Sequence, residues 1–162
     1  MAQLFVGVWP SASALRALRE YPKPGDGWVD EGQWLVNVRP LGRVTDAVAG
    51  ELLDALRFEL DGMPPPRASF GPVRSAGWLR VLVEGLDELR DVVFEATVPI
   101  IPVTHPKSMP WAPQLPLRRD RSPKELVHPL SATWTVGEVV LAKGTRTKDG
   151  HGYETVESIR LG

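Results

Sequence analysis

Short apolar runs rich in strand-forming residues recur along the chain, and proline or glycine separates them. The run at 4–9 ends before Pro10, and the run at 34–39 ends before Pro40. Runs of β-branched and aromatic residues of this length are typical of buried β-strands. The same pattern predicts further strands at 68–73, 79–83 and 114–118, and two in the tail at 133–142 and 153–161, joined by a polar loop at 143–152.

Apolar residues spaced three or four apart predict three helices between these strands. Ser11 can cap the first helix and Thr45 the second, because a hydroxyl at the N-cap accepts a hydrogen bond from a free N–H of the first turn. The segment 122–125, Ser-Pro-Lys-Glu, carries the features of a helix start and predicts a further short helix. The apolar faces of the three helices comprise Ala14, Leu15 and Leu18; Val48, Leu52, Leu56 and Leu60; and Leu86, Leu89, Val93 and Ala96.

A proline-rich segment precedes the strand at 114–118. Six prolines lie between residues 99 and 116, and they exclude regular helix there because proline lacks the backbone N–H that a helix needs. No linker divides the chain into independent units. The alternation of strands and helices therefore predicts a single α+β domain over residues 1–162.

Composition narrows the possible chemistry. The chain has no cysteine and only three histidines, His105, His128 and His151, which excludes thiolate metal sites and cysteine nucleophiles. Its 19 Lys and Arg balance 20 Asp and Glu, so any nucleic-acid contact must be a local patch. We expect no metal and no other cofactor. No apolar run reaches the roughly 18 residues that span a bilayer, so we expect a cytoplasmic protein with no membrane partner.

Four segments stand in an order that resembles one known family. They are LFVGVWP at 4–10, QWLVNVRPLG at 33–42, WAPQLPLRR at 111–119, and the closing strands from 134 to 161. This arrangement resembles the 2H phosphoesterases, specifically the LigT/ThpR-type RNA 2′,3′-cyclic phosphodiesterases, also called 2′-5′ RNA ligases. The resemblance covers nearly the whole chain. It implies a bilobal fold in which two pseudo-symmetric halves place antiparallel sheets around a central groove.

The resemblance also implies a reaction. Each half of the family's fold contributes one His-x-Thr motif to the groove, and residues two apart on a strand face the same way. One histidine then acts as general base on a water and the other as general acid on the leaving ribose oxygen, while the threonines hold the phosphate. No metal takes part, and the substrate is a 2′,3′-cyclic phosphate at an RNA 3′ end.

All four motif positions are changed in this sequence. Leu35 and Asn37 stand at the first motif, and Gln114 and Pro116 stand at the second. Neither leucine nor glutamine exchanges a proton near neutral pH, so neither replaces imidazole. Because each proton transfer contributes roughly 10²- to 10⁴-fold, losing both removes about 5 to 11 kcal/mol of transition-state stabilisation. We therefore expect the family reaction to be nearly lost.

The groove retains groups that could bind a ligand. Strand alternation predicts that Arg39 faces the same way as Leu35 and Asn37, and Arg119 matches the arginine that closes the family's second block. Arginine suits phosphate, amides such as Asn37 and Gln114 can hydrogen-bond a base or a phosphate, and tryptophan can stack on a base. The candidate binding residues are Arg39, Arg119, Asn37, Gln114, Trp34 and Trp111, although both tryptophans also suit a core.

Three hypotheses follow. The leading hypothesis is an inactive relative of the family whose groove binds a nucleotide, an RNA 3′ end or another ligand. An alternative is an active cyclic phosphodiesterase with relocated acid and base residues, for which His105 is the best-placed histidine because its segment leads into the second motif strand. The third is a structural or protein-interaction module in which Leu35 and Pro116 close the groove. The sequence leaves the oligomeric state open.

Overall fold

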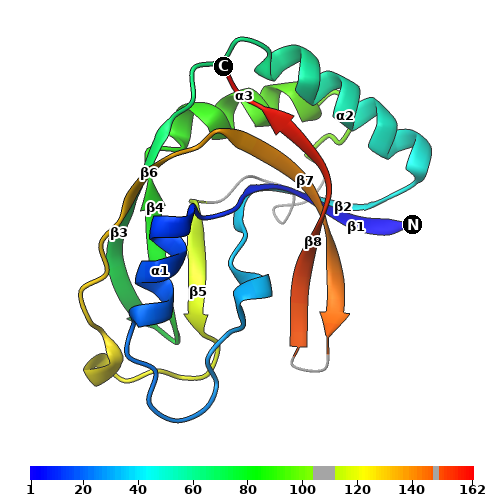
Figure 1. Ribbon diagram of the computed structural model, residues 1–162. Helices are drawn as coiled ribbons and strands as arrows, with labels where there is room; N and C mark the ends of the chain where they lie inside the picture. Colours follow the sequence, from blue (N-terminus) through cyan, green and yellow to red (C-terminus); the bar gives the residue numbers. More distant parts are fainter. Residues whose placement is uncertain (104–111, 148–149) are drawn as a thin grey trace.

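The computed structural model describes residues 1–103, 112–147 and 150–162, and it contains two antiparallel sheets of four strands each (Figure 1). The first sheet has the order β2 (Val36–Val44), β1 (Ala2–Val8), β7 (Glu138–Thr147) and β8 (Gly150–Arg160). The second has the order β5 (Gln114–Arg118), β4 (Trp78–Glu84), β3 (Arg67–Ala76) and β6 (Thr133–Thr135). The expected α+β class is confirmed.

The three expected helices form between these strands. They are α1 (Ala12–Glu20), α2 (Asp46–Leu60) and α3 (Asp87–Thr97). The Ser11 hydroxyl accepts a hydrogen bond from the Ala14 N–H, and the Thr45 hydroxyl accepts one from the Val48 N–H, so both predicted caps are confirmed. Among the described residues, no helix is long and apolar enough to cross a membrane.

Each sheet presents an apolar face to helices. Helices α2 and α3 pack on each other, with α2 against β8 and α3 against β2 (Figure 1). Helix α1 contacts β6 of the second sheet and contributes Ala14 and Leu18 to the core. Strands β1 and β2 are connected through α1, and β4 and β5 through α3, so the two halves repeat one arrangement. In both halves the strand that follows the helix lies at the edge of its sheet.

The tail differs from the sequence prediction. The expected strand at 133–142 breaks at Val136 and Gly137, so β6 joins the second sheet and β7 the first. Strands β7 and β8 then pair from Glu138↔Arg160 out to Thr147↔Gly150. The predicted polar loop at 143–152 is therefore mostly strand, because polar residues suit a hairpin with a solvated face.

Two other expectations are corrected. The predicted helix after Ser122 is only a 3-10 turn, η3 (Lys124–Leu126), and the Ser122 hydroxyl donates to the Asp120 carbonyl instead of capping it. Strand β2 does not end at Pro40 but continues through it to Val44. Proline is tolerated there because β2 is an edge strand, and Pro116 is tolerated in β5 for the same reason.

Candidate functional site

The two edge strands β2 and β5 lie beside each other and enclose a cavity of about 330 Å³. Trp34, two residues before β2, donates its indole N–H to the Pro116 carbonyl of β5 over 3.2 Å. All four positions that the sequence resemblance assigns to the motifs line this cavity, which we call the motif cavity. Its lining residues are Gln33, Leu35, Asn37, Trp78, Gln114, Pro116, Arg119 and Tyr153.

Leu35 forms part of the apolar floor of the motif cavity. Its side chain is 1% exposed and packs in a small cluster with Val140 and Ala142, bordered by Phe5 and Tyr153. A leucine here contacts carbon on several sides and offers no group that exchanges a proton. The first motif position is thus a packing position in this chain.

Asn37 lies two residues further along β2 and is held by the opposite hairpin. Its Nδ2 donates a hydrogen bond of 3.1 Å to the hydroxyl of Tyr153 on β8. Its Oδ1 is buried and has no hydrogen-bond partner among the described residues. A buried acceptor left unsatisfied is unfavourable, so the site gains when a ligand supplies a donor.

The second wall of the motif cavity comes from β5 and β4. Gln114 and Pro116 are on β5, and Trp78 starts β4. Arg119 follows β5: its Nε donates to Gln33 Oε1 over 3.1 Å, and its guanidinium carbon lies 5.8 Å from the Trp78 ring centroid. This orients a cation and an aromatic face beside the two amide side chains. Such a set suits an anion joined to a flat ring.

The prediction that Arg39 faces the groove is wrong. Gly7 pairs with Asn37 but Val6 pairs with Arg39, so Val38 is an extra residue on β2. Such a bulge reverses the alternation of side chains, and Arg39 points with Val6 into the core. It is fully buried, and it donates to the Thr97 hydroxyl and to the Ile101 carbonyl, over 2.6 Å each. Burial lowers the pKa of its guanidinium.

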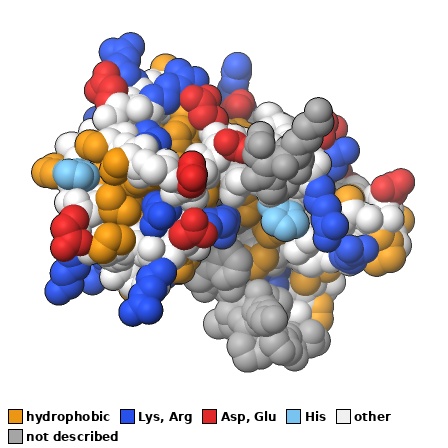
Figure 2. All heavy atoms as spheres, turned by 90° about the horizontal axis from the view of Figure 1, so that it is seen from below, with side chains coloured by type: hydrophobic (Ala, Val, Ile, Leu, Met, Phe, Trp, Pro, Cys, Tyr) orange, Lys and Arg blue, Asp and Glu red, His pale blue; other side chains and the backbone are white. Residues whose placement is uncertain are grey.

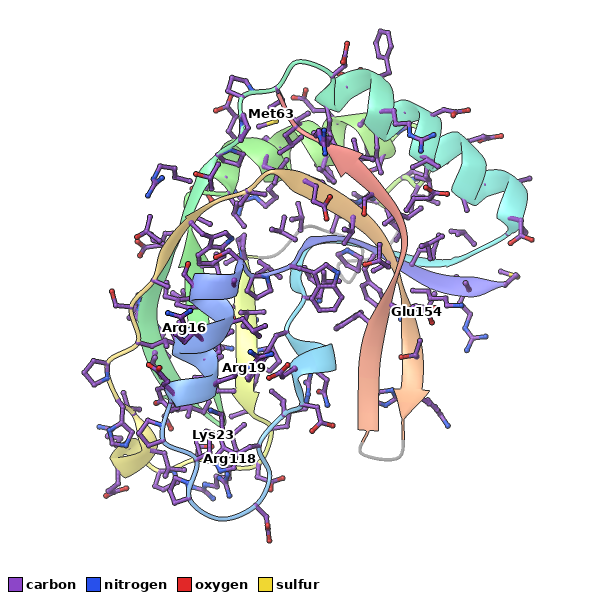
Figure 3. The ribbon with its side chains drawn as sticks, in the orientation of Figure 1. Arg16, Arg19, Lys23, Met63, Arg118 and Glu154 are labelled. Carbon is purple, nitrogen blue, oxygen red and sulfur yellow. The ribbon has the colours of Figure 1, made fainter. Side chains whose placement is uncertain are left out.

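The other predicted residues are divided between core, surface and segments outside the described residues. Trp34 is 2% exposed and belongs to the hydrophobic core, so its ring is not available for stacking in the motif cavity. Trp111 and His105 lie outside the described residues. Strand alternation predicts that Arg118 faces the same way as Gln114 and Pro116, but it points away from the motif cavity. It donates to the Asp26 and Arg121 carbonyls at the end of the molecule where Lys23 also lies (Figure 3).

The two remaining histidines occupy different surroundings. His128 donates its backbone N–H to the Tyr21 hydroxyl, and it lines neither the motif cavity nor the cavity beside it. His151 is on β8 and not in a loop as predicted, and it lines a second, larger cavity of about 730 Å³. The two cavities adjoin, because Arg119 and Tyr153 line both.

Sequence reasoning missed Gln33, Trp78 and Tyr153. The alternation of β4 held a signal for Trp78, because Leu79, Val81 and Val83 face the core and leave Trp78 on the opposite side. No local pattern marked Gln33 or Tyr153, whose roles depend on partners 86 and 116 residues away. Within the ranges that the structure describes, no three His, Cys, Asp or Glu side chains form a metal-binding group.

Comparisons with known proteins address the fold. No protein-family model matches the sequence, and no curated protein matches it. Solved structures do match over the whole chain. TT0787 of Thermus thermophilus has a TM-score of 0.80 at 19% identity, covering 98% of this chain and 97% of that one. E. coli LigT complexed with 3′-AMP has a TM-score of 0.77 at 15% identity, covering 99% of this chain and 98% of that one.

A further match is the MHV ns2 PDE domain, with a TM-score of 0.59 at 14% identity, covering 87% of this chain and 99% of that one. At these identities the likeness concerns the fold. The resemblance seen in the sequence is therefore confirmed at that level, and the chain has the LigT-like fold of the 2H phosphoesterases.

Proposed function

We propose that this protein binds a nucleotide or an RNA 3′ end in the motif cavity and does not hydrolyse it. The observation that carries the proposal is the composition of that cavity. Leu35 and Gln114 line it at the positions where the sequence resemblance places the family's histidines, and the described lining residues include no imidazole and no carboxylate. Phosphodiester hydrolysis by this fold needs an acid and a base that exchange protons near neutral pH.

The remaining groups support ligand binding. Arg119 presents a guanidinium beside the face of Trp78, and Asn37 and Gln114 offer amides on opposite walls. A charge-assisted hydrogen bond to phosphate and stacking on a base are the usual components of nucleotide recognition. Structures with the same fold include E. coli LigT complexed with 3′-AMP, with ATP and with NADP+. The cavity of about 330 Å³ also argues against the alternative of a structural module in which Leu35 and Pro116 fill the groove.

Titration calorimetry with 3′-AMP tests the proposal. We expect binding by the wild type and an affinity about tenfold or more weaker in Arg119→Gln, because a hydrogen bond to a charged group is worth roughly 1.5–3 kcal/mol. Arg16→Gln is the matched control, since Arg16 is exposed on α1 and lines neither cavity. Failure of 3′-AMP to bind, or equal losses in both variants, would contradict the proposal.

The same samples test the alternative of an active enzyme. His151 favours it, because its imidazole lines the cavity that adjoins the motif cavity. Incubation with a 2′,3′-cyclic nucleotide should give no product above background for the wild type. Turnover that follows a bell-shaped pH profile and disappears in His151→Ala would instead establish a relocated acid or base.

A further inference from the structure

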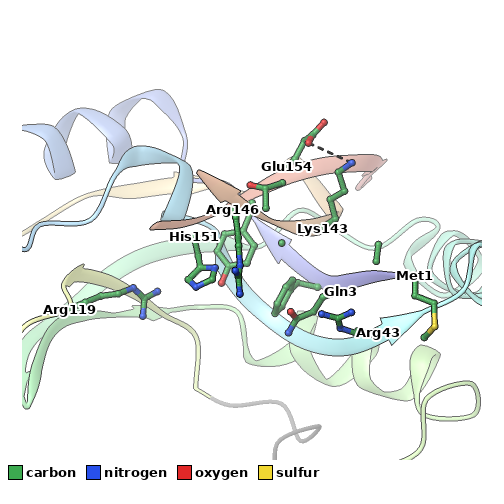
Figure 4. A pocket seen from close by; sticks show the side chains of 14 residues that line it. Met1, Gln3, Arg43, Arg119, Lys143, Arg146, His151 and Glu154 are labelled. Atoms are coloured by element: carbon green, nitrogen blue, oxygen red, sulfur yellow. Dashed lines mark ion pairs between the residues drawn. The ribbon is translucent and has the colours of Figure 1, made fainter. Parts of the chain in front are cut away.

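The larger cavity adjoining the motif cavity is rich in cations. It lies over β1 and the β7–β8 hairpin, and its lining includes Arg43, Arg119, Lys143, Arg146 and His151, with Glu154 as its carboxylate (Figure 4). We call it the basic cavity. Lys143 Nζ pairs with Glu154 at 3.7 Å, and Figure 4 shows this pair directed away from the other cations. The positive charge that remains belongs to the three arginines.

These arginines are available for a ligand. Arg43 and Arg146 are exposed, and neither has a hydrogen-bond or ion-pair partner among the described residues. Arg119 uses its Nε on Gln33, and its terminal nitrogens make no hydrogen bond within the same part of the chain. Three guanidinium groups around one cavity, with no carboxylate partner in the described ranges, repel each other and attract anions.

The position of these groups follows from strand register. Arg146 and His151 are cross-strand partners on β7 and β8, so their side chains lie beside each other on one face (Figure 4). Arg43 comes from the edge strand β2, and Arg119 from the end of β5. Three regions distant in sequence, namely β2, the end of β5 and the β7–β8 hairpin, thus direct donors at one cavity. Figure 2 shows that basic and acidic side chains are interspersed on the face seen from below.

We propose that the basic cavity is a second anion subsite, which takes further phosphates of the ligand whose end occupies the motif cavity. Arg119 belongs to both cavities and marks the point where the ligand passes from one to the other. The preferred ligand then carries two or more phosphates. A nucleoside polyphosphate and a short oligonucleotide share this chemistry. The inference rests on the proposed function, because it extends the same site.

The test compares 3′-AMP, ATP and a trinucleotide with a 3′-phosphate on the double variant Arg43→Gln/Arg146→Gln. The matched control is Arg16→Gln/Arg74→Gln, which removes the same charge from exposed positions that line neither cavity. For the wild type we expect the ligands with several phosphates to bind tighter than 3′-AMP. For the double variant we expect at least about tenfold weaker binding of those ligands and less than about twofold change for 3′-AMP.

Salt dependence gives a second readout. If Arg43 and Arg146 each contact a phosphate of the trinucleotide, the slope of log K against log salt should become shallower by about 1.4 in the double variant. Preference for ATP over the trinucleotide would identify a nucleoside polyphosphate as the source of the anion, and the reverse would identify RNA. Circular dichroism verifies that each variant is folded.

The outcomes separate this inference from the proposed function. Two results would overturn the second subsite alone. In the first, 3′-AMP binds and additional phosphates do not raise the affinity. In the second, the double variant loses the same affinity for all three ligands. The proposed function would be overturned by a different result: ATP or the trinucleotide binds through Arg43 and Arg146, 3′-AMP does not bind, and Arg119→Gln has no effect. The basic cavity would then be an isolated anion site.

Discussion

The side chain of Leu35 lies directly over Gly7, so closely that a Cβ at Gly7 would sit 2.7 Å from Leu35 Cγ and 2.8 Å from the Val36 carbonyl oxygen. The absence of a side chain at Gly7 creates the space that Leu35 fills. Leu35, directly before β2, is therefore integrated into the packing between β1 and β2.

Replacing Gly7 should destabilise the fold through this contact. We expect Gly7→Ala to lower the free energy of unfolding by about 1–3 kcal/mol, because neither Leu35 nor the backbone of Val36 can move freely. Gly50→Ala is the matched control: Gly50 is exposed in α2 with nothing within 4 Å of an added Cβ, and alanine should raise stability by about 0.5–1 kcal/mol. Urea denaturation measures the free energy of unfolding of both variants. Equal changes in the two variants would contradict the steric conflict expected at Gly7.

Restoring the motifs should create activity if the groove keeps its geometry. The variant Leu35→His/Asn37→Thr/Gln114→His/Pro116→Thr places an imidazole and a hydroxyl on each edge strand. We expect hydrolysis of a 2′,3′-cyclic nucleotide at least about 10²-fold above the wild type, since paired acid and base catalysis contributes that much or more. The control is the double variant Leu35→His/Asn37→Thr, which should hydrolyse the substrate much more slowly than the fourfold variant. A wild type already as active as the fourfold variant would contradict this expectation.

Arg39 should contribute to the stability of the fold and not to the affinity for the ligand. Arg39→Ala leaves a cavity, and it removes the donors that serve Thr97 and Ile101, so we expect a loss of about 2–5 kcal/mol. Arg43 on the same strand is exposed, so the free energy of unfolding of Arg43→Ala should stay within about 0.5 kcal/mol of the wild-type value. Affinity of the folded Arg39→Ala protein for 3′-AMP should be unchanged; a large loss of affinity at full folding would place Arg39 in the site after all.

Tyr21 should make the stability fall at alkaline pH. Its hydroxyl donates to the Leu126 carbonyl and accepts from the His128 N–H, and burial raises its pKa more than the His128 hydrogen bond lowers it. The folded state therefore favours the neutral phenol. Its contribution is complete below the ordinary tyrosine pKa of about 10 and is lost as the pH rises through the higher folded pKa.

Tyr21→Phe isolates this contribution. The variant should be less stable than the wild type at pH 8 and should lose less additional stability between about pH 9.5 and 11. Urea midpoints across that range provide the measurement. Parallel pH curves for the two proteins would show that Tyr21 does not titrate with unfolding.

Local sequence patterns determined most of the fold. Hydroxyl caps at Ser11 and Thr45 predicted where two helices begin, and the apolar faces behind them predicted the buried sides, because capping and helical spacing act over a few neighbouring positions. Four ordered segments identified the LigT-like fold, and they placed Leu35, Asn37, Gln114 and Pro116 at the motif positions that the structure brings around one cavity.

Only the tertiary structure decided which side chains reach that cavity. The extra residue at Val38 turned Arg39 into the core, although perfect alternation predicted the opposite face. Tyr153 on β8 reached Asn37 on β2 across the face of the first sheet, and Arg119 reached Gln33 from the end of the second sheet. A bulge and a cross-sheet contact depend on pairing between segments far apart in sequence. Local propensities carry no information about such pairing, so the sequence determined the fold and the pairing of strands determined the site.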